Sequence, residues 1–152
     1  MERRAVLSIL RLGLAALSLA LAVSTPAGER QVVLVVSANS PVKELHPIEI
    51  RKLFLSLPVQ RDNRPLVPVR NNSDRQLERV FLQDVVAMSQ SAYDRRILTQ
   101  TLQHGRPRPL ELQSRDEVLA RLYSDRFSVS YVWLDDAVSN PRLRRLRVIW
   151  SE

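Results

Sequence analysis

The segment with the clearest chemical potential joins a predicted strand to a predicted helix. It reads Val67-Pro68-Val69-Arg70-Asn71-Asn72-Ser73-Asp74-Arg75. The amino end of a helix carries free backbone N–H groups and the positive end of the helix dipole, and both attract anions. Asn72 and Ser73 can donate side-chain hydrogen bonds to an oxyanion, and Arg70 or Arg75 can make a bidentate contact with it. Two interpretations stay open: an anion site, or a capped helix start beside two solvated arginines.

Constellations for enzymatic or metal chemistry are missing from the sequence. The 152 residues include no cysteine and only two histidines, which excludes disulfides, thiolate-ligated metals, a cysteine nucleophile and a histidine-rich metal site. Beyond residue 27, glycine occurs only at positions 28 and 105, and neither HExxH nor GxSxG occurs, so a glycine-rich phosphate loop is excluded as well. We interpret Asp135-Asp136 as turn residues, His104 as a helix-end residue and His46 as a residue that precedes or caps a short helix. The prediction is a protein that is not an enzyme and has no metal or cofactor.

The first 27 residues have the pattern of a secretory signal peptide: a basic start, an apolar run from Leu12 to Val23, and small residues before a charged segment. Cleavage fits after Ala22 or after Ala27, and an uncleaved membrane anchor is the alternative. The apolar run is shorter than the roughly 20 residues that span a bilayer. We therefore predict a signal peptide at 1–27, one domain at 28–152, and a periplasmic or secreted location.

The chain is basic, with 23 Lys and Arg residues against 16 Asp and Glu and a formal net charge of +7. Loss of residues 1–27 would remove three basic residues and one acidic residue and lower the net charge to +5. This charge fits an anionic ligand or surface, and it fits a solvated arginine-rich face equally well. Nucleic-acid binding is not predicted, because basic and aromatic residues do not alternate and the export signal directs the chain away from cytoplasmic nucleic acid.

Hydrophobic patterning predicts four strands, at 31–37, 66–69, 128–133 and 146–150. The first is a β-branched run, typical of a strand buried on both faces as in a parallel sheet. A turn or hairpin is expected between Pro58 and Pro65, and a polar turn at 135–141.

Apolar residues at three- and four-residue spacing predict four helices. The first is a short helix that begins at Pro47 and has Ile48, Leu53, Phe54 and Leu57 on its apolar side. The second covers residues 73–87 and is capped by Asn72 or Ser73, and the third covers residues 90–102, is capped by Ser89 and buries Tyr93, Ile97, Leu98 and Leu102. The fourth runs from the capping box Ser114-Arg115-Asp116-Glu117 to about Tyr123. The alternation of strands and helices predicts an α/β domain whose sheet is covered on both sides.

Three stretches resemble the phosphate-binding proteins of ABC transporters. Asn39-Ser40-Pro41-Val42 with residues 45–55 resembles their NPV…LS…EL..IF.G stretch. Residues 66–69, with Phe81 in the following helix, resemble their VVPV…F…vL segment, and residues 127–132 resemble their GAIGYV strand. The likeness runs from about residue 32 to 150 and is greatest to the short, single-lobe relatives of these substrate-binding proteins.

The resemblance implies a periplasmic-binding-protein-like single lobe, an α/β fold with a mixed sheet covered by helices. In the full-length relatives an Arg on the strand and a Ser-Gly-Thr at the helix start hold phosphate between two lobes. Arg70 matches that Arg, and Ser73 is the nearest counterpart of the Ser-Gly-Thr, with Asp74 or Arg75 where Gly or Thr would be. Ser130 replaces the Gly of the GYV strand, at the strand end where a ligand would lie.

The leading functional prediction is an exported, non-enzymatic binding module for phosphate or a related oxyanion. Its predicted anion-binding residues are Arg70, Asn72, Ser73, Arg75 and Ser130. Its partner would be a membrane transporter or sensor protein of ABC-type phosphate uptake. The alternative is an envelope scaffold or interaction protein that keeps the fold and has lost the anion site. The sequence leaves the identity of the anion and the oligomeric state open.

Overall fold

The computed structural model describes residues 30–152, so the predicted signal peptide and both cleavage points lie outside the described residues. The core of the fold is a five-stranded mixed sheet with the strand order β5-β4-β6-β1-β7. Its strands are β1 (Gln31–Ser37), β4 (Val67–Asn71), β5 (Leu110–Leu112), β6 (Ser128–Trp133) and β7 (Leu143–Ser151).

The predicted strand at 31–37 is confirmed as β1, and six of its seven residues are buried. Side chains alternate between the two faces of a strand. Accordingly Val32, Leu34 and Val36 pack into one hydrophobic cluster, whereas Val33 and Val35 pack into a second. The parallel pairing that its β-branched run indicated is wrong, because β1 pairs antiparallel with both β6 and β7. Burial on both faces produces the continuous apolar run whatever the strand direction.

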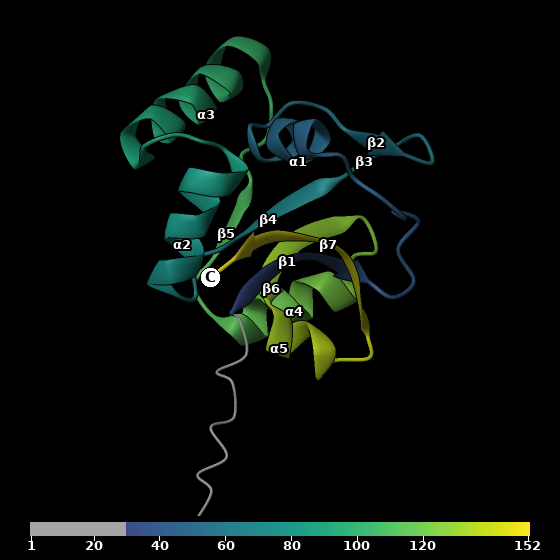
Figure 1. Ribbon diagram of the computed structural model, residues 1–152. Helices are drawn as coiled ribbons and strands as arrows, with labels where there is room; N and C mark the ends of the chain where they lie inside the picture. Colours follow the sequence, from purple (N-terminus) through teal and green to yellow (C-terminus); the bar gives the residue numbers. More distant parts are fainter. Residues whose placement is uncertain (1–29) are drawn as a thin grey trace, which may run out of the picture.

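Helices cover both faces of the sheet, as predicted (Figure 1). They are α1 (Pro47–Phe54), α2 (Arg75–Val80), the π-helical turn η1 (Phe81–Val85), α3 (Gln90–His104), α4 (Arg115–Ser124) and α5 (Leu134–Val138). The first four contribute to the cluster that contains Phe54 and Phe81, and α4 and α5 contribute to the other. Among residues 30–152 no helix is long and apolar enough to cross a membrane.

The predicted hairpin between Pro58 and Pro65 is confirmed. Its strands are β2 (Gln60–Arg61) and β3 (Arg64–Pro65), which pair antiparallel. Asp62 and Asn63 form the turn with φ of 51° and 58°. Positive φ at both turn residues matches the right-handed twist of the flanking strands, and Asp and Asn tolerate it better than most residues.

Several predicted details of the helices are wrong. The helix expected at 73–87 divides into α2 and η1, where an i+5 hydrogen bond from the Val86 N–H to the Phe81 carbonyl widens the turn and both Val85 and Val86 become buried. Its cap is Asp74, not Asn72 or Ser73. The polar turn expected at 135–141 begins inside α5.

Three leucine or isoleucine side chains expected in the core are exposed instead. Ile48 on α1 is 70% exposed, and on α3 Leu98 is 43% and Leu102 is 75% exposed. Tyr93 and Ile97 of α3 are buried, as predicted. Figure 1 shows the far end of α3 projecting beyond the sheet, and the last turn of the helix, which carries Leu102, is largely exposed.

The start of α1 offers a test of stability against pH. Glu49 Oε2 accepts a hydrogen bond from the His46 backbone N–H at 3.0 Å, and Glu49 Oε1 lies 2.9 Å from Arg61 Nη2. The His46 hydrogen bond and the Arg61 charge hold the pKa of Glu49 below its ordinary value. A carboxylate of this kind stabilises the fold above the unfolded pKa, near 4.3, and the contribution is lost as the pH falls through the folded pKa.

We therefore expect Glu49→Gln to lower the free energy of unfolding by about 0.5–1 kcal/mol at pH 7 and by little at pH 3. Urea unfolding of both proteins at the two pH values measures the difference. The matched control is Glu44→Gln, at an exposed carboxylate. An equal cost of Glu49→Gln at both pH values would contradict the assigned role of the charge.

Candidate anion-binding site

The predicted anion-binding segment lies where three parallel strands end. β4 runs parallel to both β5 and β6, so the carboxyl ends of these strands, at Asn71, Leu112 and Trp133, face the same edge of the sheet. In open α/β sheets, ligands bind beyond the carboxyl ends of the strands. The chain from Arg70 to Arg75 therefore occupies the place in the fold where a ligand is expected.

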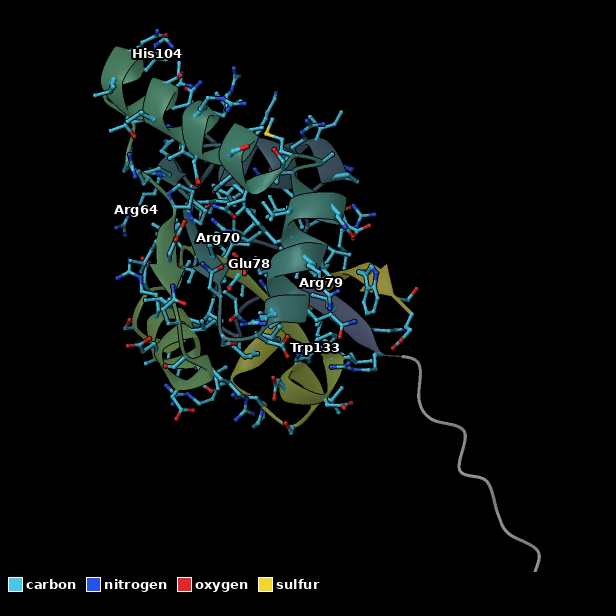
Figure 2. All side chains as sticks on the ribbon, turned by 90° about the vertical axis from the view of Figure 1, so that its left-hand side faces the viewer. Arg64, Arg70, Glu78, Arg79, His104 and Trp133 are labelled. Carbon is cyan, nitrogen blue, oxygen red and sulfur yellow. The ribbon has the colours of Figure 1, made fainter. Side chains whose placement is uncertain are left out.

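Arg70 is the buried centre of this region. It is 1% exposed, whereas the side chains of Glu111 and Glu78 are 46% and 41% exposed. Arg70 Nη1 donates to Glu111 Oε1 at 2.9 Å, and Nη2 donates to Gln90 Oε1 at 2.8 Å and to Glu78 Oε1 at 3.4 Å. Figure 2 shows Arg70 and Glu78 beside each other inside the molecule. Two carboxylates thus neutralise the buried cation.

The three partners of Arg70 come from three different elements. Glu111 lies directly opposite Arg70 in the parallel register of β4 and β5. Glu78 is on α2, and Gln90 is the first residue of α3. Gln90 is itself oriented by a hydrogen bond from its Nε2 to Asp94 Oδ1 at 2.8 Å. The guanidinium therefore holds α2, α3 and β5 together around the end of β4.

Aromatic rings cover the same guanidinium. The Arg70 Cζ atom lies 4.8 Å from the centre of the Phe81 ring and 5.0 Å from that of Tyr93, distances at which a cation is attracted to the ring faces. Burial raises the pKa of the Tyr93 and Tyr131 hydroxyls above their ordinary value, so both are neutral at physiological pH. The Tyr93 hydroxyl donates to the Phe54 carbonyl at 2.9 Å. These tyrosines act as buried hydrogen-bonding groups rather than as acids or bases.

Asn71, which the sequence analysis did not single out, joins β4 to β6 and to the loop before α2. Its Nδ2 donates to the Tyr131 carbonyl at 2.9 Å, and its backbone N–H donates to the Tyr131 hydroxyl at 3.2 Å. Its Oδ1 accepts from the backbone N–H of Ser73 at 3.1 Å and from the Ser73 hydroxyl at 2.6 Å. The Ser73 donors predicted for an oxyanion are thus used within the loop.

Asp74 places a carboxylate at the start of α2. Its Oδ1 accepts from the Gln76 backbone N–H at 2.6 Å, and its Oδ2 accepts from Trp133 Nε1 at 3.3 Å. An N-terminal carboxylate satisfies the free N–H groups and the helix dipole. The protein's own negative charge therefore occupies the position that the sequence analysis considered for an external anion.

The other predicted site residues have separate partners and surroundings. The Ser130 hydroxyl is buried and donates to the Val69 carbonyl at 2.8 Å, across the β4–β6 pair. Asn72 donates its backbone N–H to the Leu112 carbonyl at 2.9 Å, and its Oδ1 is buried without a partner among the described residues. Arg75 is exposed on the first turn of α2. Within residues 30–152 no hydrogen bond links Arg70, Asn72, Ser73, Arg75 and Ser130 to one another.

This arrangement of strands and helices is also found in solved structures. The chain aligns with an ABC-type phosphate transport receptor from Vibrio cholerae at a TM-score of 0.57 and 8% sequence identity, covering 78% of this chain and 46% of the receptor. The fold is that of phosphate ABC transporter substrate-binding proteins. A phosphate-bound substrate-binding protein from Clostridium perfringens aligns at a TM-score of 0.58 and 11% identity, and PstS from Borrelia burgdorferi at 0.57 and 12%.

The chain spans about half the length of these substrate-binding proteins. It covers 45% of the Clostridium protein and 47% of the Borrelia protein, and the alignment again includes 78% of this chain in each case. The predicted fold, a single periplasmic-binding-protein-like lobe with a mixed sheet covered by helices, is confirmed. No protein-family model and no curated protein matches the chain.

Sequence reasoning selected Arg70 but missed the groups that bind it. Glu111 belongs to the Leu110-Glu111-Leu112 alternation, which at three residues is too short to predict a strand. Glu78 lies on the same helix as the predicted cap and one turn beyond Asp74, where an acidic residue can face back toward the strand end. Within the described part of the chain no group of three or more His, Cys, Asp or Glu residues is arranged to hold a metal.

Proposed function

We propose that this chain is a non-enzymatic, single-lobe envelope protein that interacts with a protein partner and whose oxyanion position is filled by its own carboxylates. The proposal rests on the burial and the hydrogen bonds of Arg70. Its two terminal nitrogens already donate to Glu111, Glu78 and Gln90, and its side chain is inaccessible to solvent. An incoming phosphate would have to displace two carboxylates that are fixed to the protein.

Charge favours the same proposal. Glu78 and Glu111 bring two negative charges to one buried positive charge, and Asp74 adds a third negative charge at the start of α2. Like charges close to a binding position disfavour an anion, most strongly where water is excluded. The exposed leucines of α3, Leu98 and Leu102, lie one helical turn apart and give this role a small apolar surface for a partner to cover. The partner class that fits the fold is a membrane transporter or sensor protein of phosphate uptake.

Phosphate binding is the second candidate. It is supported by the fold, by the Clostridium structure with bound phosphate, and by Arg70 itself, whose Nε is buried without a partner among the described residues. For this candidate, Glu78 and Glu111, each more than two-fifths exposed, would swing outward and leave the guanidinium to the anion.

The experiment that separates the candidates is thermal unfolding in phosphate, sulfate and chloride at matched ionic strength. With the test anions at low millimolar concentration, where the general stabilising effect of sulfate and phosphate is small, the interaction protein gives equal melting temperatures in the three salts. If this proposal is right, the Glu78→Gln/Glu111→Gln variant is expected to show a higher melting temperature in phosphate than in chloride. The buried Arg70 guanidinium then has no carboxylate partner and accepts an external anion.

The control Glu44→Gln/Glu117→Gln removes two exposed carboxylates elsewhere and is expected to respond to the three salts like the native protein. A ligand at 100 times its dissociation constant adds about 2.7 kcal/mol to the folded state, which such a measurement resolves. A phosphate-selective rise in the native protein that disappears in Arg70→Gln would overturn the proposal in favour of phosphate binding.

A further inference from the structure

A second concave region lies away from the Arg70 cluster, between the β2–β3 hairpin, the start of β4 and the segment that connects α3 to β5. This groove has a volume of about 320 Å³. Its apolar walls include Leu53, Leu57, Val59, Leu66, Val67 and Leu110. Small-molecule sites are typically concave and mostly apolar, with a few polar groups that fix orientation. The groove has this composition, and nothing in the proposed function uses it.

The walls offer almost no backbone hydrogen-bond donors. Four of the lining residues are prolines, at positions 58, 65, 68 and 107, and proline has no N–H. The N–H groups of Ser56, Leu57, Leu66 and Val67 already donate to carbonyl groups of the protein. A bound peptide would bring C=O groups that lose their hydrogen bonds to water, and the walls offer few N–H groups to replace them, which is costly. A hydrocarbon chain has no such groups and pays no such penalty.

Two arginines at the rim give the groove its polarity. Arg106 and Arg108 line it, and no Asp or Glu does. Arg106 is held in place, since its Nη1 donates to Gln100 Oε1 at 2.6 Å and its backbone N–H donates to the Gln100 carbonyl at 3.2 Å. Gln100 is buried on α3, and Gly105 ends that helix with φ of 62°, a conformation that favours glycine. The turn after α3 thus presents a fixed cation beside an apolar groove.

We propose that this groove binds a long-chain carboxylate, with its hydrocarbon chain between β4 and the α3–β5 segment and its carboxylate at Arg106 and Arg108. The carboxylate supplies the negative charge that pairs with Arg106 and Arg108, since no Asp or Glu lines the groove. Guanidinium–carboxylate pairs are strong and directional. The chain buries apolar surface of the groove, including the exposed side chain of Leu110. Carboxylate binding in this groove does not depend on whether the Arg70 cluster binds an anion.

The test is calorimetric titration of the protein with sodium dodecanoate below its micelle concentration. One saturable site is expected. Dodecyl maltoside and dodecyltrimethylammonium, which have the same chain with a neutral and a cationic head, are expected to bind at least about tenfold more weakly because they form no guanidinium pair. Equal binding of all three amphiphiles, or no saturable binding of dodecanoate, would overturn the proposal.

Matched variants locate the site. Arg106→Gln/Arg108→Gln is expected to weaken dodecanoate binding about tenfold, whereas Arg79→Gln/Arg96→Gln, which changes the net charge equally on exposed helix surfaces, leaves it unchanged. Figure 2 shows Arg79 on the outer side of α2. Similar loss in both double variants would mean unspecific attraction to a basic surface and would contradict the site.

A second pair of variants tests the apolar part. Leu110→Ser is expected to weaken dodecanoate binding about fivefold by removing apolar contact area in the groove. Leu102→Ser makes the same change at an exposed leucine that does not line the groove, and it is expected to bind dodecanoate like the native protein. The urea midpoint of each variant checks that the fold is intact. If a folded Leu110→Ser variant binds dodecanoate as tightly as the native protein does, the ligand lies elsewhere and the proposal is overturned.

Discussion

Arg70→Ala is expected to lower the free energy of unfolding by about 3 kcal/mol. The substitution leaves a cavity beside the rings of Phe81 and Tyr93 and removes the donor to Gln90. Removing one partner of a buried ion pair costs about 3–5 kcal/mol, and the lower end applies here because only Arg70 is buried while Glu78 and Glu111 can turn to water. Urea unfolding followed by circular dichroism measures the loss as a lower midpoint.

Two control variants separate the loss of the buried charge from the loss of side-chain volume and from the loss of an exposed ion pair. Arg70→Met keeps most of the side-chain volume and is expected to cost less than Arg70→Ala, because no cavity forms. Arg115→Ala breaks the 2.7 Å pair with Asp136, in which Arg115 is half exposed, and is expected to cost less than about 1 kcal/mol. If Arg70→Ala costs no more than Arg115→Ala, the description of Arg70 as the buried centre joining α2, α3 and β5 is wrong.

Phe81→Ala is expected to cost about 3–5 kcal/mol, the range for a large aromatic side chain in a core. Phe81 is completely buried. Its ring centre lies 5.4 Å from that of Phe54, 5.3 Å from that of Tyr93 and 5.5 Å from that of Tyr131. It therefore joins α1, α3 and β6 at the beginning of the π-helical turn.

The same unfolding experiment tests this prediction, with Phe81→Leu as the variant that keeps apolar volume and is expected to lose less than half as much. Because Phe81 also covers the Arg70 guanidinium, the costs of Phe81→Ala and Arg70→Ala are not expected to be additive in the double variant. Strict additivity would show that the ring and the cation do not interact.

Much of the fold could be predicted because local signals and tertiary packing agree. Ser89 caps α3 and Ser114 caps α4, as their sequence positions indicate. Val118, Leu119 and Leu122, at helical spacing along α4, are buried. The short strand β5 was missed because a three-residue alternation is too brief to distinguish from a loop. The exposure of Leu98 and Leu102 could not be predicted, since periodicity identifies an apolar side but not whether another element covers it.

The site was predictable only in part. The residue types around Arg70 marked the segment correctly as the place where strand ends and a helix start meet. Its partners, however, are 8, 20 and 41 positions away along the chain. Contacts over such separations depend on strand order and register, which no local pattern reports. The prediction that Arg70, Asn72, Ser73, Arg75 and Ser130 bind an anion stays a prediction, tested by the salt comparison above.

The position of β1 has a consequence for folding kinetics. The first strand of the described chain lies between β6 and β7, which come more than 90 residues later in the sequence. Closing so long a loop is entropically costly, and proteins with many contacts between distant parts of the chain fold slowly. Until β7 is present, β1 has an unpaired edge rich in valine, which is prone to pair with other chains. A folding chain of this protein therefore remains open to aggregation until β7 has paired with β1.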